Sequence, residues 1–236
     1  MLLEPGTIAA ELTVAGFARH DAPQMETALA ARGLADWDSF AASWNDLGID
    51  AYMADGGRYR RRRHAVFHRD LDAMVRMPHR AHYQSVDYNN LNGGVARWFD
   101  PVTNQIARHP VLLASLDLAY QVFNRVTPHG LWEIELHQFR ISAGTGAEGK
   151  PTPEGMHRDG VDFVMVMLVT RENVQSGVTS IEDADHRALG SFTLTHPMDA
   201  TFVDDHRVYH GVTPIVPVNP EAPAWRDVLV ATFRRI

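Results

Sequence analysis

The sequence predicts a mainly β fold, with a sandwich or barrel-like core and helices packed outside it. Two observations carry this prediction. Short segments of strand character follow one another from residue 130 onward, and no convincing helical pattern lies between them. Helical patterns occur instead in the first half of the chain, where they suit an outer layer around the core.

The strand candidates are bounded by glycine, proline and other turn residues. In order, they read LWEIELHQFRIS, VDFVMVMLVT, GVTSIED, GSFTLTH, ATFVDDHRVYHGVTPIV and WRDVLVATFRR. The segment SAGTGAEGKPTPEG, which is rich in glycine and proline, forms a long loop before the second of them. Long loops in compact domains are often functional.

Three segments of the first half carry the signals of helices. Residues 22–32 end before Gly33, and residues 36–48 are expected to begin with Asp36 as their cap. The clearest helix, HPVLLASLDLAYQVFNRV, opens at Pro110 and repeats apolar residues at spacings of three and four. We expect the apolar face of this helix to pack on the core.

The composition excludes several classes of site. The chain has no cysteine, which excludes disulfides, thiolate metal sites, iron–sulfur clusters and a thiol nucleophile. A metal would have to bind through histidine, aspartate or glutamate. The net charge of −7 and the pI near 6.0 lack the basic excess of a nucleic-acid-binding protein. No apolar stretch approaches the roughly 18 residues of a membrane span, and the first residues lack signal-peptide features, so we expect a cytoplasmic protein.

One basic run departs from this acidic balance. The sequence RYRRRR, residues 58–63, contains a single aromatic residue, Tyr59. We expect a solvated strand face or an internal ion-pairing surface here rather than a phosphate-binding patch.

The tripeptide His-Arg-Asp occurs twice, at residues 68–70 and 157–159, so this pattern alone is weak evidence for a site. The second copy leads into an apolar strand, where residues two apart face the same side. His157 and Asp159 can therefore converge on one point. Downstream, VDDHRVYHGVTPI supplies two candidate third ligands. We favour His210, at the edge of a strand, over His206 in a polar turn.

Two histidines and one carboxylate on the same side of an ion form the facial triad of non-haem Fe(II) oxygenases, which leaves coordination positions open. The structural alternative is an ordinary hydrogen-bonded pair of histidine and aspartate, and spacing alone leaves both interpretations open. A further basic residue, Arg226, lies sixteen positions after His210, at the start of the last predicted strand. Its guanidinium is suited to grip a carboxylate, or it could pair with Asp227 or Asp205.

These elements together resemble the Fe(II)/2-oxoglutarate-dependent dioxygenases. The resemblance rests on the H-x-D pair, a distal histidine in the setting HGVTPI, and an arginine in the last strand. More narrowly, YNNLNGGVARWFDP, PEGMHRDGVDFV and RDVLVATF are similar to the bacterial subgroup that includes the L-isoleucine dioxygenases. The resemblance implies a double-stranded β-helix, the jelly-roll core of cupins, over residues 58–236, with residues 1–57 as an N-terminal helical segment packed on it.

The resemblance also implies the roles of the site residues. His157, Asp159 and His210 would be the catalytic ligands of Fe(II), with 2-oxoglutarate and O2 as cosubstrates, and Arg226 would bind the distal carboxylate of 2-oxoglutarate. Several relatives carry a hydroxyl residue two positions after this arginine, where this chain has Val228. The candidates for a second contact with 2-oxoglutarate are Thr232, Tyr209 and Gln138.

By resemblance, the reaction is hydroxylation of an aliphatic side chain of a free L-amino acid, coupled to oxidative decarboxylation of 2-oxoglutarate to succinate and CO2. An amino acid carries an ammonium and a carboxylate, so its pocket needs an acidic and a basic partner. The candidates for substrate contacts are Arg140, Glu133, Asp87, Asn89 and Phe163.

Two other functions stay open on the sequence. The same chemistry could act on an amino acid held in a peptide or on a carrier protein, as in secondary metabolism. The other is a cupin-like metal-binding module without catalysis, against which the intact site residues argue. The expected partner is a small-molecule amino acid, with no nucleic acid and no membrane. The oligomeric state, a homodimer included, is left open.

Overall fold

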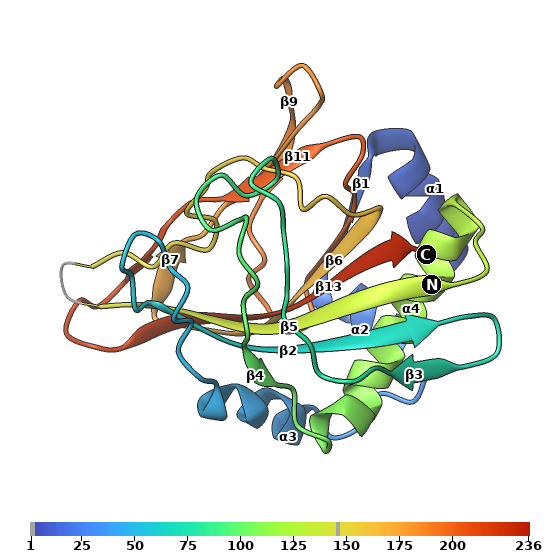
Figure 1. Ribbon diagram of the computed structural model, residues 1–236, viewed down its shortest axis with the longest axis horizontal. Helices are drawn as coiled ribbons and strands as arrows, with labels where there is room; N and C mark the ends of the chain where they lie inside the picture. Colours follow the sequence, from blue (N-terminus) through green and yellow to red (C-terminus); the bar gives the residue numbers. More distant parts are fainter. Residues whose placement is uncertain (1–2, 145–146) are drawn as a thin grey trace.

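The main sheet of the protein carries helices on one face and two smaller sheets on the other (Figure 1). The computed structural model describes residues 3–144 and 147–236. Its eight-stranded sheet has the order β1-β10-β6-β13-β5-β2-β3, with β4 paired to β2. A three-stranded sheet, β11-β8-β9, and a two-stranded sheet, β12-β7, complete the β structure. The predicted mainly β fold with flanking helices is confirmed.

The elements have the following bounds. The helices are α1 (Pro5–Ala15), α2 (Ala22–Ala30), α3 (Trp37–Ala42) and α4 (Pro110–Val126), with 3-10 turns at Ser43–Asp46 and Ile106–Arg108. The main sheet contains β1 (Phe17–His20), β2 (Arg60–Arg69), β3 (Met74–Arg76), β4 (Asp100–Pro101), β5 (Trp132–Ala143), β6 (Phe163–Glu172), β10 (Ala200–Asp204) and β13 (Ala224–Arg235). The smaller sheets contain β7 (Val174–Ser176), β8 (Thr179–Glu182), β9 (Ala188–Phe192), β11 (Tyr209–Val212) and β12 (Ile215–Pro217).

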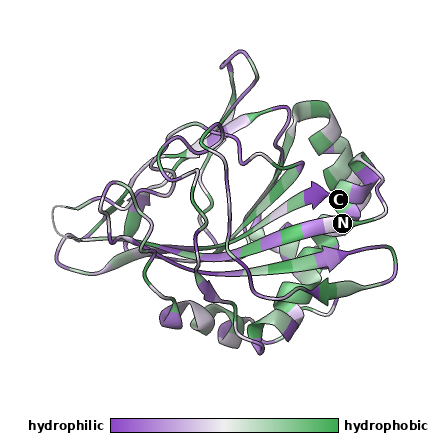
Figure 2. Ribbon diagram, in the orientation of Figure 1, coloured by the Kyte–Doolittle hydropathy of each residue, from purple (hydrophilic) through white to green (hydrophobic). Residues whose placement is uncertain are grey.

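Helix α4 forms the centre of the helical layer, and it matches the segment that the sequence predicts. Pro110 occupies its first turn, and the side chain of His109 accepts a hydrogen bond from the N–H of Val111. Its Phe123 ring is fully buried and stacks on Phe163 of β6 at 4.8 Å between centroids. Figure 2 shows the hydrophobic residues concentrated where the helices meet the main sheet.

Each long strand of the main sheet divides its side chains between two environments, because successive side chains point to opposite faces. On β13, Leu229, Ala231 and Phe233 belong to the apolar cluster that the helices cover. Val228 and Val230 point the other way, toward residues of the smaller sheets and the loops between them. The space between the sheets is therefore lined by one face of β13 and of its neighbours, and this face contains the candidate site.

The N-terminal segment departs from the sequence prediction in two ways. Helix α1 was not anticipated, and residues 17–20 form strand β1, which pairs with β10 at the edge of the main sheet. The segment is thus not purely helical, and its apolar residues share one cluster with α4. The boundary at residues 57 and 58 stays a prediction.

Asp36 occupies the expected N-cap position of α3, but it does not cap the helix with its side chain. Asp36 has a left-handed backbone (φ 57°) and its side chain caps no helical N–H group. It instead accepts a hydrogen bond from Ser39 Oγ. Among the described residues, none of the helices is both long and apolar enough to cross a membrane.

Replacing Phe123 by alanine tests the contact between α4 and the sheet. Removal of this fully buried ring should lower the free energy of unfolding by about 3–5 kcal/mol, because it leaves a cavity among aromatic neighbours. Urea unfolding of Phe123→Ala measures the loss, with Val14→Ala, at a position 81% exposed, as the control. Equal stabilities of the two variants would contradict this packing.

Candidate active site

His157 and His210, far apart in the chain, are joined by an isolated antiparallel bridge. The N–H of His157 donates to the carbonyl of His210 (3.0 Å), and the N–H of His210 donates to the carbonyl of His157 (2.9 Å). Residues paired directly in this way carry their side chains on the same face. The two imidazole centroids accordingly lie 4.5 Å apart.

Asp159 completes a compact group with these two histidines. Its Oδ1 lies 3.7 Å from His157 Nε2 and its Oδ2 lies 3.3 Å from His210 Nε2. The turn that carries it is held by Asp205, whose carboxylate accepts hydrogen bonds from the N–H groups of Asp159 (2.9 Å), Gly160 (2.7 Å) and Val161 (3.1 Å). The backbone around the group is therefore fixed from a second segment of the chain.

The protonation and orientation of this group fit a divalent metal. The Nδ1 of His157 donates to the carbonyl of Gly155 (3.0 Å), which leaves Nε2 as the nitrogen that faces Asp159. The Nε2 of His210 is buried and has no hydrogen-bond partner in the described part of the chain. Burial disfavours a charged imidazole, yet the hydrogen bond and charge of Asp159 raise the pKa of His157 to about 9. The group thus attracts positive charge, and a metal ion would replace the proton.

A second group of side chains also brings potential ligand atoms within 4.8 Å of one another: His64, His82, Glu135 and His137. Hydrogen bonds already engage one nitrogen of each ring and the carboxylate of Glu135. The carboxylate of Glu135 can only accept, so His64 Nε2 (3.0 Å) and His82 Nδ1 both donate to it. Arg62 can only donate, so His137 Nδ1 accepts from it (2.8 Å).

The tautomers of this second group follow from these bonds. Burial lowers the pKa of His64, His82 and His137, so each ring is neutral and carries one N–H. The ring of His137 must carry its proton on Nε2, where a metal would need a lone pair. The positive charge of Arg62 beside it further disfavours a cation. We therefore assign the metal site to the first group alone.

The triad and, from the second group, His82, Glu135 and His137 lie in the wall of a cavity between the main sheet and the smaller sheets, with a volume of about 330 Å³. The wall also has an apolar part, which contains Val164, Val166, Ile181, Val203 and Val230. Volumes from roughly 300 Å³ upward are typical of sites for small molecules. The cavity combines an apolar surface with a few charged groups.

Arg226 lies in the wall of the same cavity and is 2% exposed. Neither carboxylate proposed from the sequence pairs with it. Asp227 points to the opposite face of β13, where it binds Arg140, and Asp205 binds the backbone near Asp159. Burial, together with the nearby charge of Arg171, lowers the pKa of Arg226 to about 10. Its Nε has no partner among residues 3–144 and 147–236, so it is available to an anionic ligand.

Comparison with known proteins places the chain in a family. Residues 41–232 match the family described as 2OG-Fe dioxygenase. The chain belongs to this dioxygenase family. Members of the family use Fe(II), 2-oxoglutarate and O2.

Two curated relatives of the dioxygenase are similar over part of their length. The L-isoleucine-4-hydroxylase of Bacillus thuringiensis is 26% identical over 156 residues, which cover 64% of each chain. The 3(1)-hydroxy-L-isoleucine 4-dioxygenase of Pantoea ananatis is 24% identical over 155 residues, which cover 64% of this chain and 63% of that protein. The dioxygenase therefore aligns with slightly less than two thirds of either relative.

Solved structures resemble this dioxygenase over nearly its whole length. The crystal structure of a bsmA homologue from Methylobium petroleophilum PM1 is 37% identical, with a TM-score of 0.86, and the match covers 100% of this chain and 94% of that chain. The structure of IDO from Bacillus thuringiensis is 18% identical with a TM-score of 0.80, covering 99% and 100% of the two chains. The expected double-stranded β-helix is thereby confirmed.

The structure separates the three candidates for a second cosubstrate contact in the dioxygenase. Thr232 lines the cavity, but it lies six residues beyond Arg226 on β13, roughly 20 Å away at the rise of a strand. The two residues therefore cannot grip one carboxylate. Tyr209 packs outside the described cavity wall, against Arg158 (4.3 Å from guanidinium carbon to ring centroid). Gln138 faces the helices and donates to Ser43 Oγ (2.9 Å).

The five candidates for substrate contacts divide in the same way. Glu133 and Asn89 line the cavity, whereas Asp87 is exposed and lies outside the described wall. Arg140 is on the other face of β5, where two of its nitrogens each lie 2.7 Å from the carboxylate of Asp227. Phe163 stacks on α4. For Asp87, Arg140 and Phe163 the expected contact with substrate is wrong, because their side chains do not reach the cavity.

Several residues of the site were not identified from the sequence. Asp205 was considered only as a partner of Arg226, although its place in the segment between β10 and β11 brings it against the triad. Arg60 and Arg62 were expected on a solvated strand face or an internal ion-pairing surface; they do pair with the buried Asp50, but their place in the cavity wall was not anticipated. The alternation of β2 could have indicated that only every second arginine of this run is solvated. The rejected ligand candidate His206 is exposed and lies 3.1 Å from Asp162.

The choice between the two groups of potential ligands can be tested by metal stoichiometry. The protein should bind one Ni(II) ion per chain, His157→Ala and His210→Ala should bind none, and His82→Ala should keep one, because in the second group the nitrogens that face Glu135 carry protons and Arg62 adds positive charge. Elemental analysis after dialysis measures this. Loss of the ion in His82→Ala, with retention in His157→Ala, would reverse the assignment.

Removing the support from Asp205 should weaken metal binding without removing a ligand. Asp205→Ala frees the N–H groups of the turn that carries Asp159, so the affinity for Ni(II) should fall by roughly 10- to 100-fold. Asp204→Ala is the neighbouring control. The Asp204 carboxylate accepts from the N–H of His206, whereas the three N–H groups of the turn donate to Asp205. Calorimetry compares the two variants, and equal affinities would show that Asp205 does not position the triad.

Proposed function

We propose that the protein is an Fe(II)- and 2-oxoglutarate-dependent dioxygenase that hydroxylates an aliphatic side chain of a free L-amino acid. The observation that carries the proposal is a single cavity that contains a facial set of metal ligands, an unpaired buried arginine and an apolar wall. The names of the two isoleucine-oxidising relatives support the amino acid as substrate.

His157, Asp159 and His210 would hold the iron on one side and leave the cavity side open. The three ligands carry a total charge of −1, which leaves Fe(II) short of neutrality and favours an anionic cosubstrate at the metal. Bound Fe(II) supplies the redox chemistry in which O2 gives one oxygen atom to 2-oxoglutarate, yielding succinate and CO2, and the other to a C–H bond of the substrate. The triad side chains position this chemistry at the cavity wall.

Arg226 supplies the binding energy for the distal carboxylate of 2-oxoglutarate. A buried guanidinium without a carboxylate partner destabilises the fold unless a ligand compensates its charge. This feature argues against a metal-binding module without a cosubstrate. The valine and isoleucine side chains of the wall exclude water and offer a surface for an aliphatic group.

Replacing Arg226 by alanine should lower the affinity for 2-oxoglutarate by about 10- to 100-fold, because it removes a charge-assisted hydrogen bond of roughly 1.5–3 kcal/mol. The affinity is measured by calorimetry on the Ni(II)-loaded protein. Arg125→Ala, on the exposed side of α4, is the control and should leave the affinity unchanged. An unaltered affinity in Arg226→Ala would place the distal carboxylate elsewhere.

The proposed reaction is tested by incubation with Fe(II), 2-oxoglutarate and a panel of free L-amino acids under air. We expect succinate together with an amino acid heavier by one oxygen atom, in equal amounts. Succinate without any hydroxylated amino acid would contradict the proposal that an amino acid is the substrate, but it would agree with 2-oxoglutarate as the cosubstrate. Absence of succinate with every member of the panel would contradict the function as a whole.

A further inference from the structure

In addition to Arg226, three buried guanidinium groups lie in the cavity wall. Arg60 and Arg62 lie on β2, and Arg97 lies in the segment before β4, where it forms a bridge with His82. Their exposures are 5%, 4% and 1%, and all three line the cavity. Such burial of arginine is rare unless a partner compensates the charge.

The negative charge in direct contact with this arginine cluster (Arg60, Arg62 and Arg97) is too small to balance it. Asp50 lies 2.8 Å from Arg60 Nε and 3.6 Å from Arg62 Nη1, and it is the one carboxylate of the described residues that pairs with any of the three. N–H groups are left without an acceptor in the described structure at Arg60 Nη2, Arg62 Nε and Arg97 Nε. The cluster therefore carries excess positive charge and free donors, which suit an anion.

The Arg62 side chain is held by contacts on several sides. The guanidinium carbon of Arg62 lies between the rings of Phe99 (3.7 Å to the centroid) and Phe139 (4.3 Å). Its Nη2 donates to His137, whose ring is stacked on His64. Burial and the neighbouring charge of Arg60 lower the pKa of Arg62, which agrees with a shortage of negative charge around it.

One side chain connects the arginine cluster to the metal-binding group. Gln84 donates from Nε2 to the carbonyl of Asp159 (3.1 Å) and accepts at Oε1 from Arg97 (3.5 Å). These two hydrogen bonds place Arg97 Nη2 at most about 9 Å from the Asp159 carbonyl oxygen. A small amino acid has a length within this upper limit, so a molecule held at Arg97 would extend toward the segment that carries the triad.

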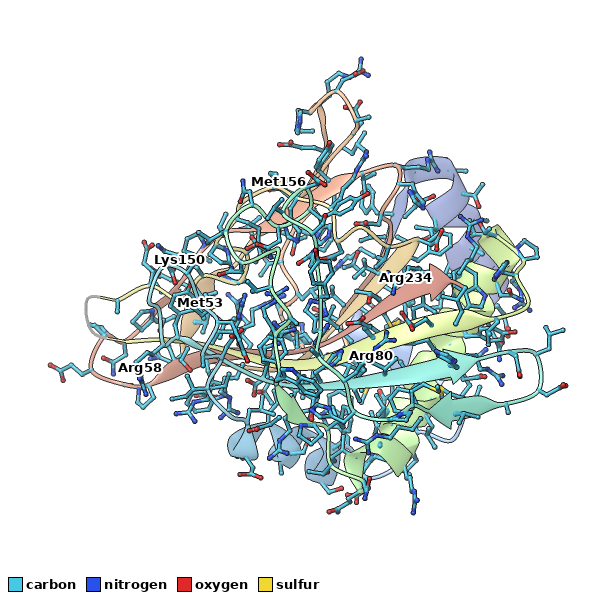
Figure 3. All side chains as sticks on the ribbon, in the orientation of Figure 1. Met53, Arg58, Arg80, Lys150, Met156 and Arg234 are labelled. Carbon is cyan, nitrogen blue, oxygen red and sulfur yellow. The ribbon has the colours of Figure 1, made fainter. Side chains whose placement is uncertain are left out.

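A carboxylate oxygen with no partner lies on the other side of this gap. Glu154 lines the cavity, its Oε1 is 3.6 Å from His157 Nε2, and its Oε2 is buried without a donor in the described residues. Outside the triad, the other acidic side chains of the described wall, Glu133 and Glu135, already bind Arg80, and each has a further cationic or N–H partner. Figure 3 shows Arg80 and Arg234, both partners of Glu133, away from the labelled Met156 near the triad.

We infer that the arginine cluster binds the free carboxylate of the substrate and that Glu154 binds its ammonium group. The inference rests on the proposed function, and it assigns the substrate to zwitterionic α-amino acids. It makes the carboxylate a requirement for binding, since an amide or a thioester places no charge among the three guanidinium groups. The amino acid held on a carrier protein or inside a peptide is thereby excluded as the substrate.

The inference is tested by calorimetry on the Ni(II)-loaded protein with 2-oxoglutarate, which binds ligands without turnover. The probes are aliphatic L-amino acids, beginning with L-isoleucine, their carboxamides, and the corresponding acids without the amino group. The wild-type protein should bind the best amino acid roughly 10- to 100-fold more tightly than its carboxamide. The inference would be overturned if no amino acid binds, or if an amino acid and its carboxamide bind equally. This comparison needs no variant.

Variants assign the effect to the cluster. Arg97→Gln should lower the affinity for the amino acid by about 10- to 100-fold and reduce the preference for the amino acid over its carboxamide. The affinity for 2-oxoglutarate should stay within about twofold of the wild-type value. Arg62→Lys, which keeps the charge but loses the planar fork, should also lower the affinity for the amino acid. The matched control is Arg61→Gln, on the same strand but with its side chain on the other face, near Leu47. Unchanged affinity in both Arg97→Gln and Arg62→Lys would overturn the inference.

Glu154→Gln addresses the ammonium end. This variant should lower the affinity for the amino acid and leave the affinity for the acid without the amino group unchanged. Equal effects on both ligands would contradict the role of Glu154.

The outcomes separate this inference from the proposed function. An amino acid that binds through the cluster but is never oxidised contradicts the function alone. An amino acid hydroxylated with the same KM by wild type and Arg97→Gln contradicts the inference alone.

Discussion

The bridge between His157 and His210 is the contact on which the site depends. Two reciprocal backbone hydrogen bonds fix the relative position of segments that are more than fifty residues apart in the chain. They place both imidazoles on one face without using any side-chain atom. The side-chain nitrogens therefore stay available to a ligand, and Asp159, two residues from His157, falls between them. Asp205 then only has to hold the turn at the edge of this bridge.

Strand alternation decides which residues take part in chemistry and which hold the fold. On β5, Glu133, Glu135 and His137 face the cavity, while Ile134 and Leu136 pack under the helices. The same division on β13 and β6 supplies an apolar core and a mixed cavity wall from one set of strands. Stability and function are thus assigned to opposite faces of one sheet. A substitution on the helix-facing side should act on stability, and one on the cavity side should act on ligands.

The sequence was sufficient for the parts of the molecule that depend on local pattern. The apolar spacing in α4 predicted that helix, the strand-like segments bounded by turn residues predicted β5, β6 and β13, and the H-x-D pair with its distal histidine predicted the residues that the structure brings together. Contacts between distant segments were less accessible. Gln138 and Arg140 were chosen as ligand contacts although their parity on β5 is opposite to that of Glu133, and comparison of the two parities could have excluded them. The arginine cluster escaped prediction because the run at residues 58–63 alternates between cavity and solvent, and Arg97 joins it only in three dimensions.

The position of a bound metal tests the account most directly. Crystals grown without oxygen in the presence of Fe(II) and 2-oxoglutarate allow the ion to be located by anomalous X-ray diffraction at the iron edge. We expect a single strong peak within roughly 2.0–2.3 Å of His157 Nε2, His210 Nε2 and an Asp159 carboxylate oxygen, the range for divalent metals bound by such ligands. A peak among His64, His82, Glu135 and His137, with none at the bridge between His157 and His210, would contradict it.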